Sequence, residues 1–173
     1  MNSNVKYFVR IAGMLFLICA LTALIIAGVN ALTKDAIDAN NKAKLDSTIE
    51  DIFEKGVNTT LLDIKAEDGV TEVFEVKSGD KLVGYAVHVL PVGFKGEIEM
   101  MVGYNTDLIC KSVRIINQSE TPGLGSKVTG DDFLSQFEKN GEFTPIAGAT
   151  VSSKAVYSGV LAATKTLEGG IEK

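Results

Sequence analysis

The 173-residue sequence is poor in the residues that build most metal and nucleophilic sites: it has one histidine, two cysteines and no tryptophan. Cys19 lies inside a long apolar run and Cys110 in a strand-like segment, so the two cannot plausibly pair. No cysteine spacing suits zinc or iron–sulfur ligation. His88 falls in an alternating, strand-like run without a second histidine or a clustered carboxylate. We therefore expect a packed or surface role for His88 and no metal site.

Signatures of common enzyme classes are missing as well. The chain has no phosphate-binding P-loop, no dinucleotide-binding glycine run after a strand, and no histidine partner for a nucleophile. Its carboxylates are spread over segments that read as solvated faces. The sequence therefore argues against a hydrolytic enzyme, and we expect no catalytic residue in this chain.

Acidic residues are absent before residue 33. All 22 Asp and Glu residues lie beyond it, together with 15 of the 17 basic residues, because only Lys6 and Arg10 precede it. The later part of the chain therefore has a net charge of −7, which is a poor match for nucleic acid or an anionic lipid surface.

One long apolar run occupies residues 11–32 and contains no charged side chain. A bilayer core requires about 20 apolar residues in a helix, so this run is long enough to span a membrane. A cleaved signal peptide, cut after Ala31, is the alternative, but its apolar region would exceed the usual length of about 7–15 residues. A lipoprotein signal ending at Cys19 is disfavoured because Ile18, rather than a small residue, precedes it.

The charges that flank this run predict its orientation. Lys6 and Arg10 precede it, whereas Lys34 is followed by acidic residues. Excess positive charge on the N-terminal side places residues 1–10 in the cytoplasm and the chain beyond residue 32 outside it. We therefore expect a single-pass protein of the cytoplasmic (inner) membrane with an extracytoplasmic domain.

The segment after the apolar run predicts an α+β domain on a helical stalk. Apolar residues at near-helical spacing indicate that residues 33–56 continue the transmembrane helix outward. Alternating runs at 71–77 and 82–90, and again at 97–104 and 108–116, are typical of two hairpins. Asp131 and Asp132 are expected to cap a short helix over 133–139, and a last helix is expected over about 150–167. We expect residues 57–173 to form a small domain of antiparallel sheet with helices packed on it.

Thr150 stands at the expected start of the last helix, after Pro145 and Gly148. A helix N-terminus offers unpaired N–H groups and a positive dipole end, which suit a phosphate. The Thr150 hydroxyl could hold a phosphate or be esterified to it, but an ordinary threonine N-cap explains the same pattern and is common. Two interpretations also remain for the glycine-containing loops at 93–96 and 120–125. Each could approach a flat ligand or form a tight turn.

Residues 147–153 read AGATVSS, which resembles the Ser/Thr-Gly-Ala-Thr signature of covalent FMN-binding domains. That family includes the RnfG subunit of the Rnf electron-transport complex and its relative NqrC of the sodium-pumping quinone reductase. Two further segments, 93–103 (GFKGEIEMMVG) and 120–125 (ETPGLG), are similar to the same family in the same order, and so is the single N-terminal span. The resemblance covers essentially the whole chain. The short length of the chain favours RnfG over NqrC. It departs from the family at Ala147, where a Ser or Thr hydroxyl is usual.

The resemblance implies a phosphoester between the Thr150 hydroxyl and the phosphate of FMN, made by a separate flavin transferase on the outer side. It implies that the 120–125 loop lies beside the flavin ring, with Thr121 at its polar edge and Leu124 at its face. The cofactor-binding residues expected on this basis are Thr150, Gly148, Ala149, Val151, Ser152, Ser153, Glu120, Thr121, Gly123 and Leu124.

The function implied by the resemblance is that of an electron relay. The chain would be a subunit of a membrane-bound Rnf complex that couples electron transfer between ferredoxin and NAD to Na⁺ or H⁺ translocation, with no independent catalysis. Its partners would be other membrane, flavin and iron–sulfur subunits. The alternatives are an NqrC-like subunit of a Na⁺-translocating NADH:quinone reductase and a non-catalytic extracytoplasmic flavin-binding or sensory module.

Overall fold

A computed structural model describes residues 3–140 and 143–171 of the chain. The first helix, α1, runs from Ser3 to Phe53, so the apolar run and the segment after it form one continuous helix. The chain divides into two units, residues 1–43 and 44–173, so the last turns of α1 belong to the folded domain. Residues 1 and 2 of the predicted cytoplasmic N-terminus lie outside the described residues.

One helix of the described chain is long and apolar enough to cross a membrane, and it is the part of α1 that begins at Lys6. Its large apolar side chains are exposed, with Leu24 and Ile26 about 70% accessible. A helix that is hydrophobic all round is stable only where something other than water covers it. This unit therefore has the composition and length of a membrane anchor.

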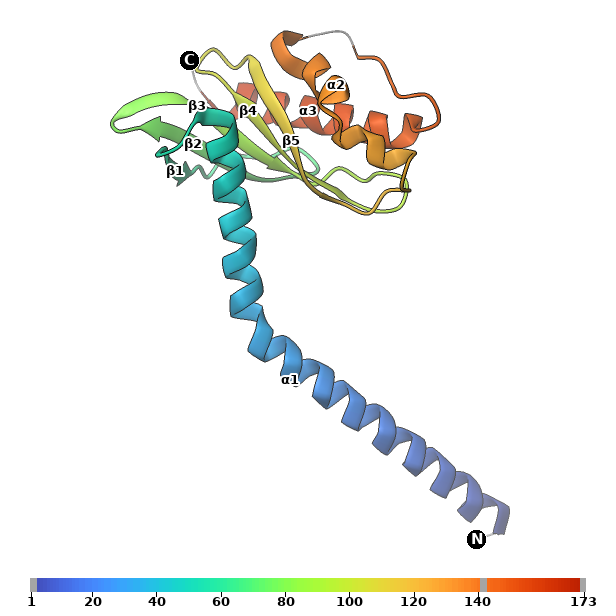
Figure 1. The fold of residues 1–173 in the computed structure, drawn as a ribbon. Coiled ribbons are helices and arrows are strands. Elements are labelled where there is room, and N and C mark those ends of the chain that lie inside the picture. The colour runs from blue at the N-terminus through green and yellow to red at the C-terminus, as the bar shows by residue number, and fades with distance from the viewer. Residues whose placement is uncertain (1–2, 141–142, 172–173) are drawn as a thin grey trace. The chain divides into compact units, whose positions relative to one another are not determined.

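The domain is built on a five-stranded antiparallel sheet with the strand order β1-β2-β3-β4-β5 (Figure 1). The strands are β1 (Asn58–Leu61), β2 (Val70–Ser78), β3 (Lys81–Val89), β4 (Ile98–Tyr104) and β5 (Cys110–Gln118). The two predicted hairpins and the α+β class are confirmed. β1 was not expected, because its four exposed residues, NTTL, show no alternation; it forms by pairing with the free edge of β2.

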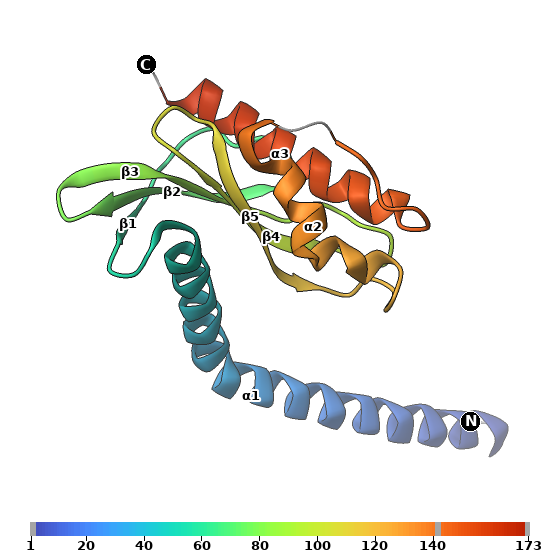
Figure 2. The ribbon, with the colours of Figure 1, turned by 45° about the horizontal axis from the view of Figure 1, so that its top comes forward.

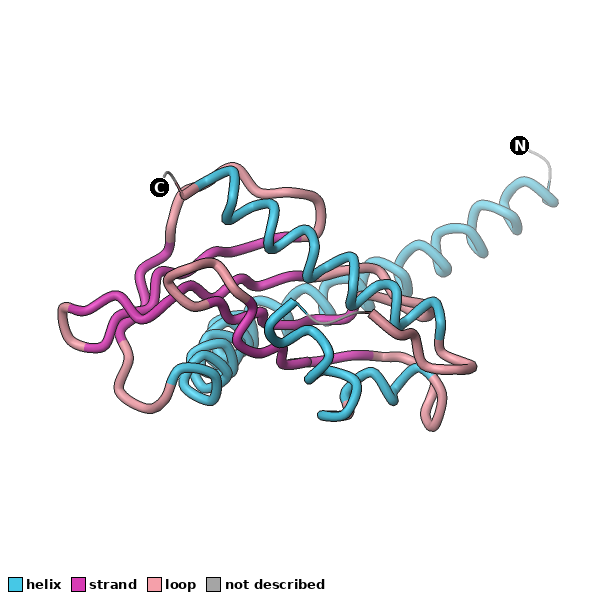
Figure 3. Tube along the Cα trace, turned by 90° about the horizontal axis from the view of Figure 1, so that it is seen from above, coloured by secondary structure: helices cyan, strands magenta, loops and turns pink. Residues whose placement is uncertain are grey.

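One face of the sheet is covered by helices from the C-terminal part of the chain (Figures 2 and 3). They are η1 (Gly125–Thr129), α2 (Asp131–Leu134), η2 (Ser135–Asn140) and α3 (Thr150–Gly170). Tyr104 of β4 joins α3 to the sheet: its buried hydroxyl donates to the Val160 carbonyl at 3.1 Å and lies 2.9 Å from Thr164 Oγ1. The expected aspartate cap of the short helix is wrong. Gly130 is the N-cap residue of α2, and Asp131 and Asp132 lie inside its first turn.

The other face of the sheet is covered by the end of α1. Ile49, Ile52 and Phe53 are buried there against Val76, Ala86 and Met101. Because successive strand residues point to opposite faces, Val87 and Val89 pack with α3 while Ala86 packs with α1. The domain is thus a three-layer unit whose sheet is buried on both faces.

Candidate functional site

Three separate segments meet at the N-terminal end of α3. They are the loop after β3, the loop after β5, and the turn that leads into α3 together with the first turn of that helix, and they lie at the same end of the domain in Figures 1 and 2. Together they enclose a cavity of about 370 Å³. The lining residues are Phe94, Glu120, Thr121, Leu124, Gly125, Gly148, Ala149, Thr150, Val151 and Ser152.

Thr150 is the first residue inside α3 and is not its cap. The N-cap position belongs to Ala149, whose side chain has no hydrogen-bonding atom, and no side chain caps this helix end. The chain enters the helix through a turn in which Gly148 has a φ of +79° and the Ala149 N–H donates to the Ile146 carbonyl at 3.0 Å. An ordinary threonine cap is therefore wrong as an explanation of Thr150, whose exposed side chain lines the cavity.

The start of α3 has the features of an anion site. The first N–H groups of a helix have no partner within the helix, and the helix dipole adds partial positive charge at this end. The first N–H that α3 itself satisfies is that of Ser153, which donates to the Ala149 carbonyl at 2.9 Å. The preceding N–H groups, of Thr150, Val151 and Ser152, are therefore available to a ligand in the cavity.

The three hydroxyls at this end of α3 have different roles. The Ser152 hydroxyl is buried and donates to Glu120 Oε2 at 2.5 Å. Ser153 is fully buried, and its Oγ accepts the Ile146 N–H at 3.1 Å, which secures the turn before the helix. Of the three, Thr150 alone is exposed.

Glu120 connects all three segments. Its side chain is only 4% exposed. One carboxylate oxygen, Oε2, accepts from Ser152 of α3, and the other, Oε1, accepts the Lys95 N–H at 2.9 Å. The backbone N–H groups of Phe94 and Gly96, in the same loop, also favour the ionised form of Glu120.

These contacts set the charge state of the carboxyl group. Burial opposes ionisation of Glu120, but the hydrogen bonds from Ser152 and the loop N–H groups outweigh it and hold the pKa of Glu120 below its usual value. The cavity therefore has an ionised, hydrogen-bonded carboxylate in its wall at neutral pH.

Two glycines make room for this carboxylate. A Cβ atom on Gly93 would lie 2.5 Å from Glu120 Oε1, and one on Gly125 would lie 2.6 Å from Glu120 Oε2 and 2.7 Å from Ser152 Oγ. None of these three distances is compatible with an alanine at the observed positions. Gly93 and Gly125 thus serve close packing around Glu120, and Gly125 also lines the cavity.

Eight of the ten residues predicted to contact the cofactor line the cavity, and two do not. Ser153 is buried on the Ile146 side, and Gly123 lies in a turn with a φ of +75°, where its N–H donates to Ser126 Oγ at 2.9 Å. Phe94 and Gly125 were not among the predicted contacts although both line the cavity. The sequence feature that could have identified these two residues is the glycine content of the loops that contain them.

The apolar side chains of the lining are exposed. Phe94, Leu124 and Val151 come from the three different segments and are 68%, 49% and 53% accessible. Pockets for cofactors combine apolar walls with a few fixed polar groups. This cavity has that composition, with the helix N–H groups and Thr150 as its polar end. Tyr85 and Tyr104, two aromatic residues of the sheet, are buried in the core and are not available to a ligand.

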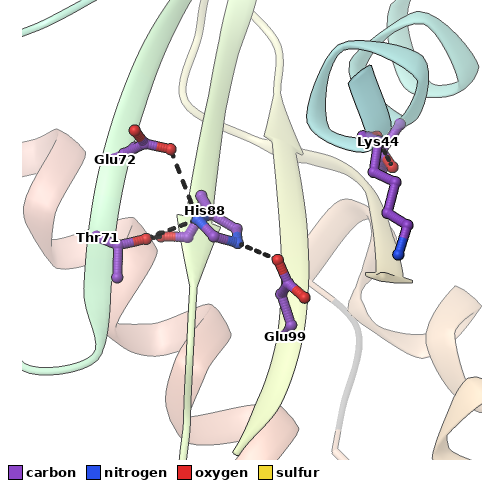
Figure 4. A network of polar contacts seen from close by, with 6 residues as sticks. Lys44, Thr71, Glu72, His88 and Glu99 are labelled. Carbon is purple, nitrogen blue, oxygen red and sulfur yellow. Dashed lines mark hydrogen bonds and ion pairs between the residues drawn. The ribbon is translucent and has the colours of Figure 1, made fainter. Parts of the chain in front are cut away.

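His88 lies on the sheet face away from α3 and is a packed residue. It is 7% exposed; its Nδ1 is 2.7 Å from Thr71 Oγ1, and its Nε2 is 3.2 Å from Glu99 Oε1 (Figure 4). Glu72 Oε2 lies 3.7 Å from Nδ1. No cluster of three metal-ligating side chains occurs among the described residues.

Comparison with known proteins identifies the two parts of the chain. Residues 1–52 match the family model of the RnfG N-terminal region, and residues 93–165 match that of the FMN-binding domain. A subunit of the ion-translocating oxidoreductase complex of Aliivibrio fischeri is 30% identical over an alignment of 159 residues that covers 75% of this chain and 76% of that protein. The chain belongs to the RnfG family.

Other relatives agree with this assignment. A subunit of the Na⁺-translocating ferredoxin:NAD⁺ oxidoreductase complex of Acetobacterium woodii is 28% identical over 184 residues, covering 90% of this chain and 89% of that protein. The crystal structure of Shewanella oneidensis NqrC superposes with a TM-score of 0.51 at 18% identity, covering 64% of this chain and 79% of that one. The fold of this RnfG-family domain is thus shared with NqrC.

Proposed function

We propose that this chain is a membrane-anchored electron relay that carries FMN as a phosphoester on Thr150. The observation that carries the proposal is the position of the Thr150 hydroxyl: exposed, in the first turn of α3, and on the wall of a cavity. The match of residues 93–165 to the FMN-binding domain supports the same site, because it spans all three cavity segments.

The residues present fit FMN at both of its ends. The open N–H groups of the first turn of α3 suit the phosphate, and a phosphodiester keeps one negative charge there. The helix end stabilises such a charge by about 0.3–1 kcal/mol, and by more where it is partly buried. Phe94, Leu124 and Val151 suit a flat apolar ring system, and Thr121 and nearby backbone amides suit its polar edge.

Attachment would be a phosphoryl transfer to Thr150. Its Oγ1 forms a bond to the FMN phosphorus of a flavin nucleotide donor in which that phosphate is part of a phosphoanhydride. The anhydride bond breaks, the departing nucleotide takes the electron pair, and the hydroxyl proton passes to a base of a separate flavin transferase. Covalent attachment prevents loss of the cofactor outside the cytoplasm.

Bound FMN supplies the redox chemistry, and the protein supplies its position and electrostatics. We expect the chain to catalyse no reaction on its own. It would accept electrons from a reduced, membrane-embedded centre and pass them to another flavin subunit. The relatives are named as subunits of complexes that translocate Na⁺ or protons with ferredoxin:NAD⁺ oxidoreductase activity. We infer the same kind of complex here.

The topology we propose follows from the charges that flank the apolar run. Residues 1–10 lie in the cytoplasm, residues 11–32 span the inner membrane, residues 33–43 extend outward, and residues 44–173, which include the last turns of α1, form the extracytoplasmic flavin domain. The partners are the other Rnf subunits in the membrane and the flavin transferase on the outer side. The match of residues 1–52 to the RnfG N-terminal region favours this complex over an NqrC-like role in a quinone reductase.

A denaturing gel viewed under ultraviolet light tests the attachment. The full chain is expressed in membranes together with a flavin transferase, and we expect a fluorescent band that is lost in Thr150→Ala. Thr144→Ala is the matched control, because Thr144 is an exposed hydroxyl in the same segment that does not line the cavity. A dark wild-type band contradicts covalent attachment and leaves a non-covalent flavin-binding or sensory module, whereas a bright Thr150→Ala band contradicts attachment at Thr150. The subunits that co-purify with the chain separate the Rnf complex from a quinone reductase.

A further inference from the structure

One buried carboxylate holds together the three segments that enclose the cavity. Glu120 receives the Ser152 hydroxyl from α3 on one oxygen and the Lys95 N–H from the 93–96 loop on the other. These contacts join positions 32 and 25 residues apart in the chain. Glu120 itself belongs to the loop after β5, so its side chain contacts both of the other segments.

We propose that Glu120 is a positioning residue that fixes the first turn of α3, and with it Thr150, for phosphoester formation. This inference rests on the proposed function. Ser152 is two residues after Thr150 in the same turn, and its buried hydroxyl is the contact through which Glu120 holds that turn against the 93–96 loop. Orientation of a nucleophile matters because a misplacement of about 1 Å can reduce a rate by a factor of roughly 10².

The geometry distinguishes a positional role from an electrostatic one. In Glu120→Gln the amide oxygen can still accept the Lys95 N–H, and the amide nitrogen can donate to Ser152 Oγ, since a hydroxyl both donates and accepts. The bridge therefore survives while the negative charge is lost. Glu120→Ala removes the bridge and the charge together.

The other end of the bridge offers a second pair of variants. Ser152→Ala removes the contact to α3 but leaves Glu120 bonded to the 93–96 loop, so it is the milder perturbation of the fold. Ser152→Thr keeps the hydroxyl. Ser158→Ala is the matched control within α3, because the Ser158 hydroxyl only donates to the Ala155 carbonyl at 2.8 Å and lies outside the cavity.

The experiment measures loading of the full chain, purified without flavin in detergent, by a flavin transferase and its flavin nucleotide donor. In-gel flavin fluorescence, followed over time at several concentrations of the chain, gives the rate constant of loading at saturation and the chain concentration at which loading is half-maximal. Near-UV circular dichroism of each unloaded variant reports whether the domain is folded. A purely structural role would lower the folded fraction, whereas a positioning role lowers the rate constant of folded protein without changing half-saturation.

We expect the rate constant to fall roughly tenfold or more in Ser152→Ala and Glu120→Ala, and to stay within about threefold of wild type in Glu120→Gln and Ser152→Thr. Ser158→Ala should load like wild type.

Equal rates for wild type and Ser152→Ala would overturn the inference. A Glu120→Gln rate as low as that of Glu120→Ala would also overturn it, because charge rather than position would then be responsible. If Glu120→Ala is unfolded, the Ser152 pair decides. A wild-type chain that does not load overturns the proposed function itself, whereas a wild type that loads no faster than Ser152→Ala overturns only this inference.

Discussion

Replacing Gly93 with alanine would add a methyl group to the most tightly packed point around Glu120. The new Cβ would lie 2.5 Å from Glu120 Oε1 and 2.9 Å from Ile98 Cδ1. The isoleucine methyl can move, but the carboxylate is held from its other side by Ser152 and from the loop by the Lys95 N–H. The variant must therefore either displace the carboxylate or strain the loop.

Both responses have similar free-energy consequences. Overpacking of a tight site destabilises a protein by about 1–3 kcal/mol. Losing a hydrogen bond to a charged group costs about 1.5–3 kcal/mol. We therefore expect Gly93→Ala to lower the free energy of unfolding by about 1–3 kcal/mol, which corresponds to a decrease in Tm of roughly 3–12 °C for a domain of this size.

Gly96→Ala is the matched control, because a Cβ at that position of the same loop would meet no atom within 4 Å. The assay is urea unfolding of the full chain in detergent, followed by near-UV circular dichroism of the buried tyrosines, since the chain has no tryptophan. We expect Gly96→Ala to unfold within about 0.5 kcal/mol of wild type. Equal unfolding midpoints for Gly93→Ala and Gly96→Ala would refute the packing described around Glu120.

Three further predictions concern buried groups of the domain. Ionised Glu120, whose pKa is lowered in the folded state, contributes stability that is present above the unfolded carboxyl pKa of about 4.3 and is lost as pH falls through the lower folded pKa. In Glu120→Gln the urea concentration at the unfolding midpoint should therefore fall less steeply at acid pH than in wild type. An unchanged pH dependence would contradict an ionised Glu120 in the folded protein. Burial, and secondly the charge of Glu138, raises the pKa of the Cys110 thiol to about 12, so maleimide should label Cys110 in a Cys19→Ser chain only after unfolding. Tyr104→Phe removes the hydroxyl contacts to α3 and should lower the free energy of unfolding by about 0.5–1.5 kcal/mol, measured by urea unfolding; a wild-type midpoint would show that these contacts contribute nothing.

Local sequence patterns were sufficient to predict the elements that frame the site. The alternation in 71–77 and 82–90 and the turn between them predicted β2 and β3, and the apolar run at 11–32 predicted the membrane-compatible part of α1. These features depend on residues within one or two turns of each other. The edge strand β1 was not predictable in this way, because its strand conformation comes from pairing with β2 and not from its own exposed residues.

The internal geometry of the site could not be predicted from the sequence. The motif around Thr150 indicated a helix start, but its position relative to the N-cap depends on the turn formed by Ile146, Gly148 and Ala149. Glu120 was identified only as a residue near the cofactor, and nothing in the sequence indicated that its carboxylate is bonded to Ser152 and to the 93–96 loop. Contacts between residues 25 and 32 positions apart leave no periodic signal in the sequence.

The most direct test of the central claim is to locate the modified residue by mass spectrometry. Trypsin releases residues 140–154 as one peptide, which contains four hydroxyl side chains: Thr144, Thr150, Ser152 and Ser153. Ser152 and Ser153 are buried and bonded to Glu120 and to the Ile146 N–H, whereas Thr150 lies exposed on the cavity wall. We expect that, in chain loaded by the transferase, this peptide carries the mass of FMN less one water and that fragmentation places it on Thr150. An unmodified peptide, or fragments that place the added mass on any of the other three hydroxyls, would contradict attachment at Thr150.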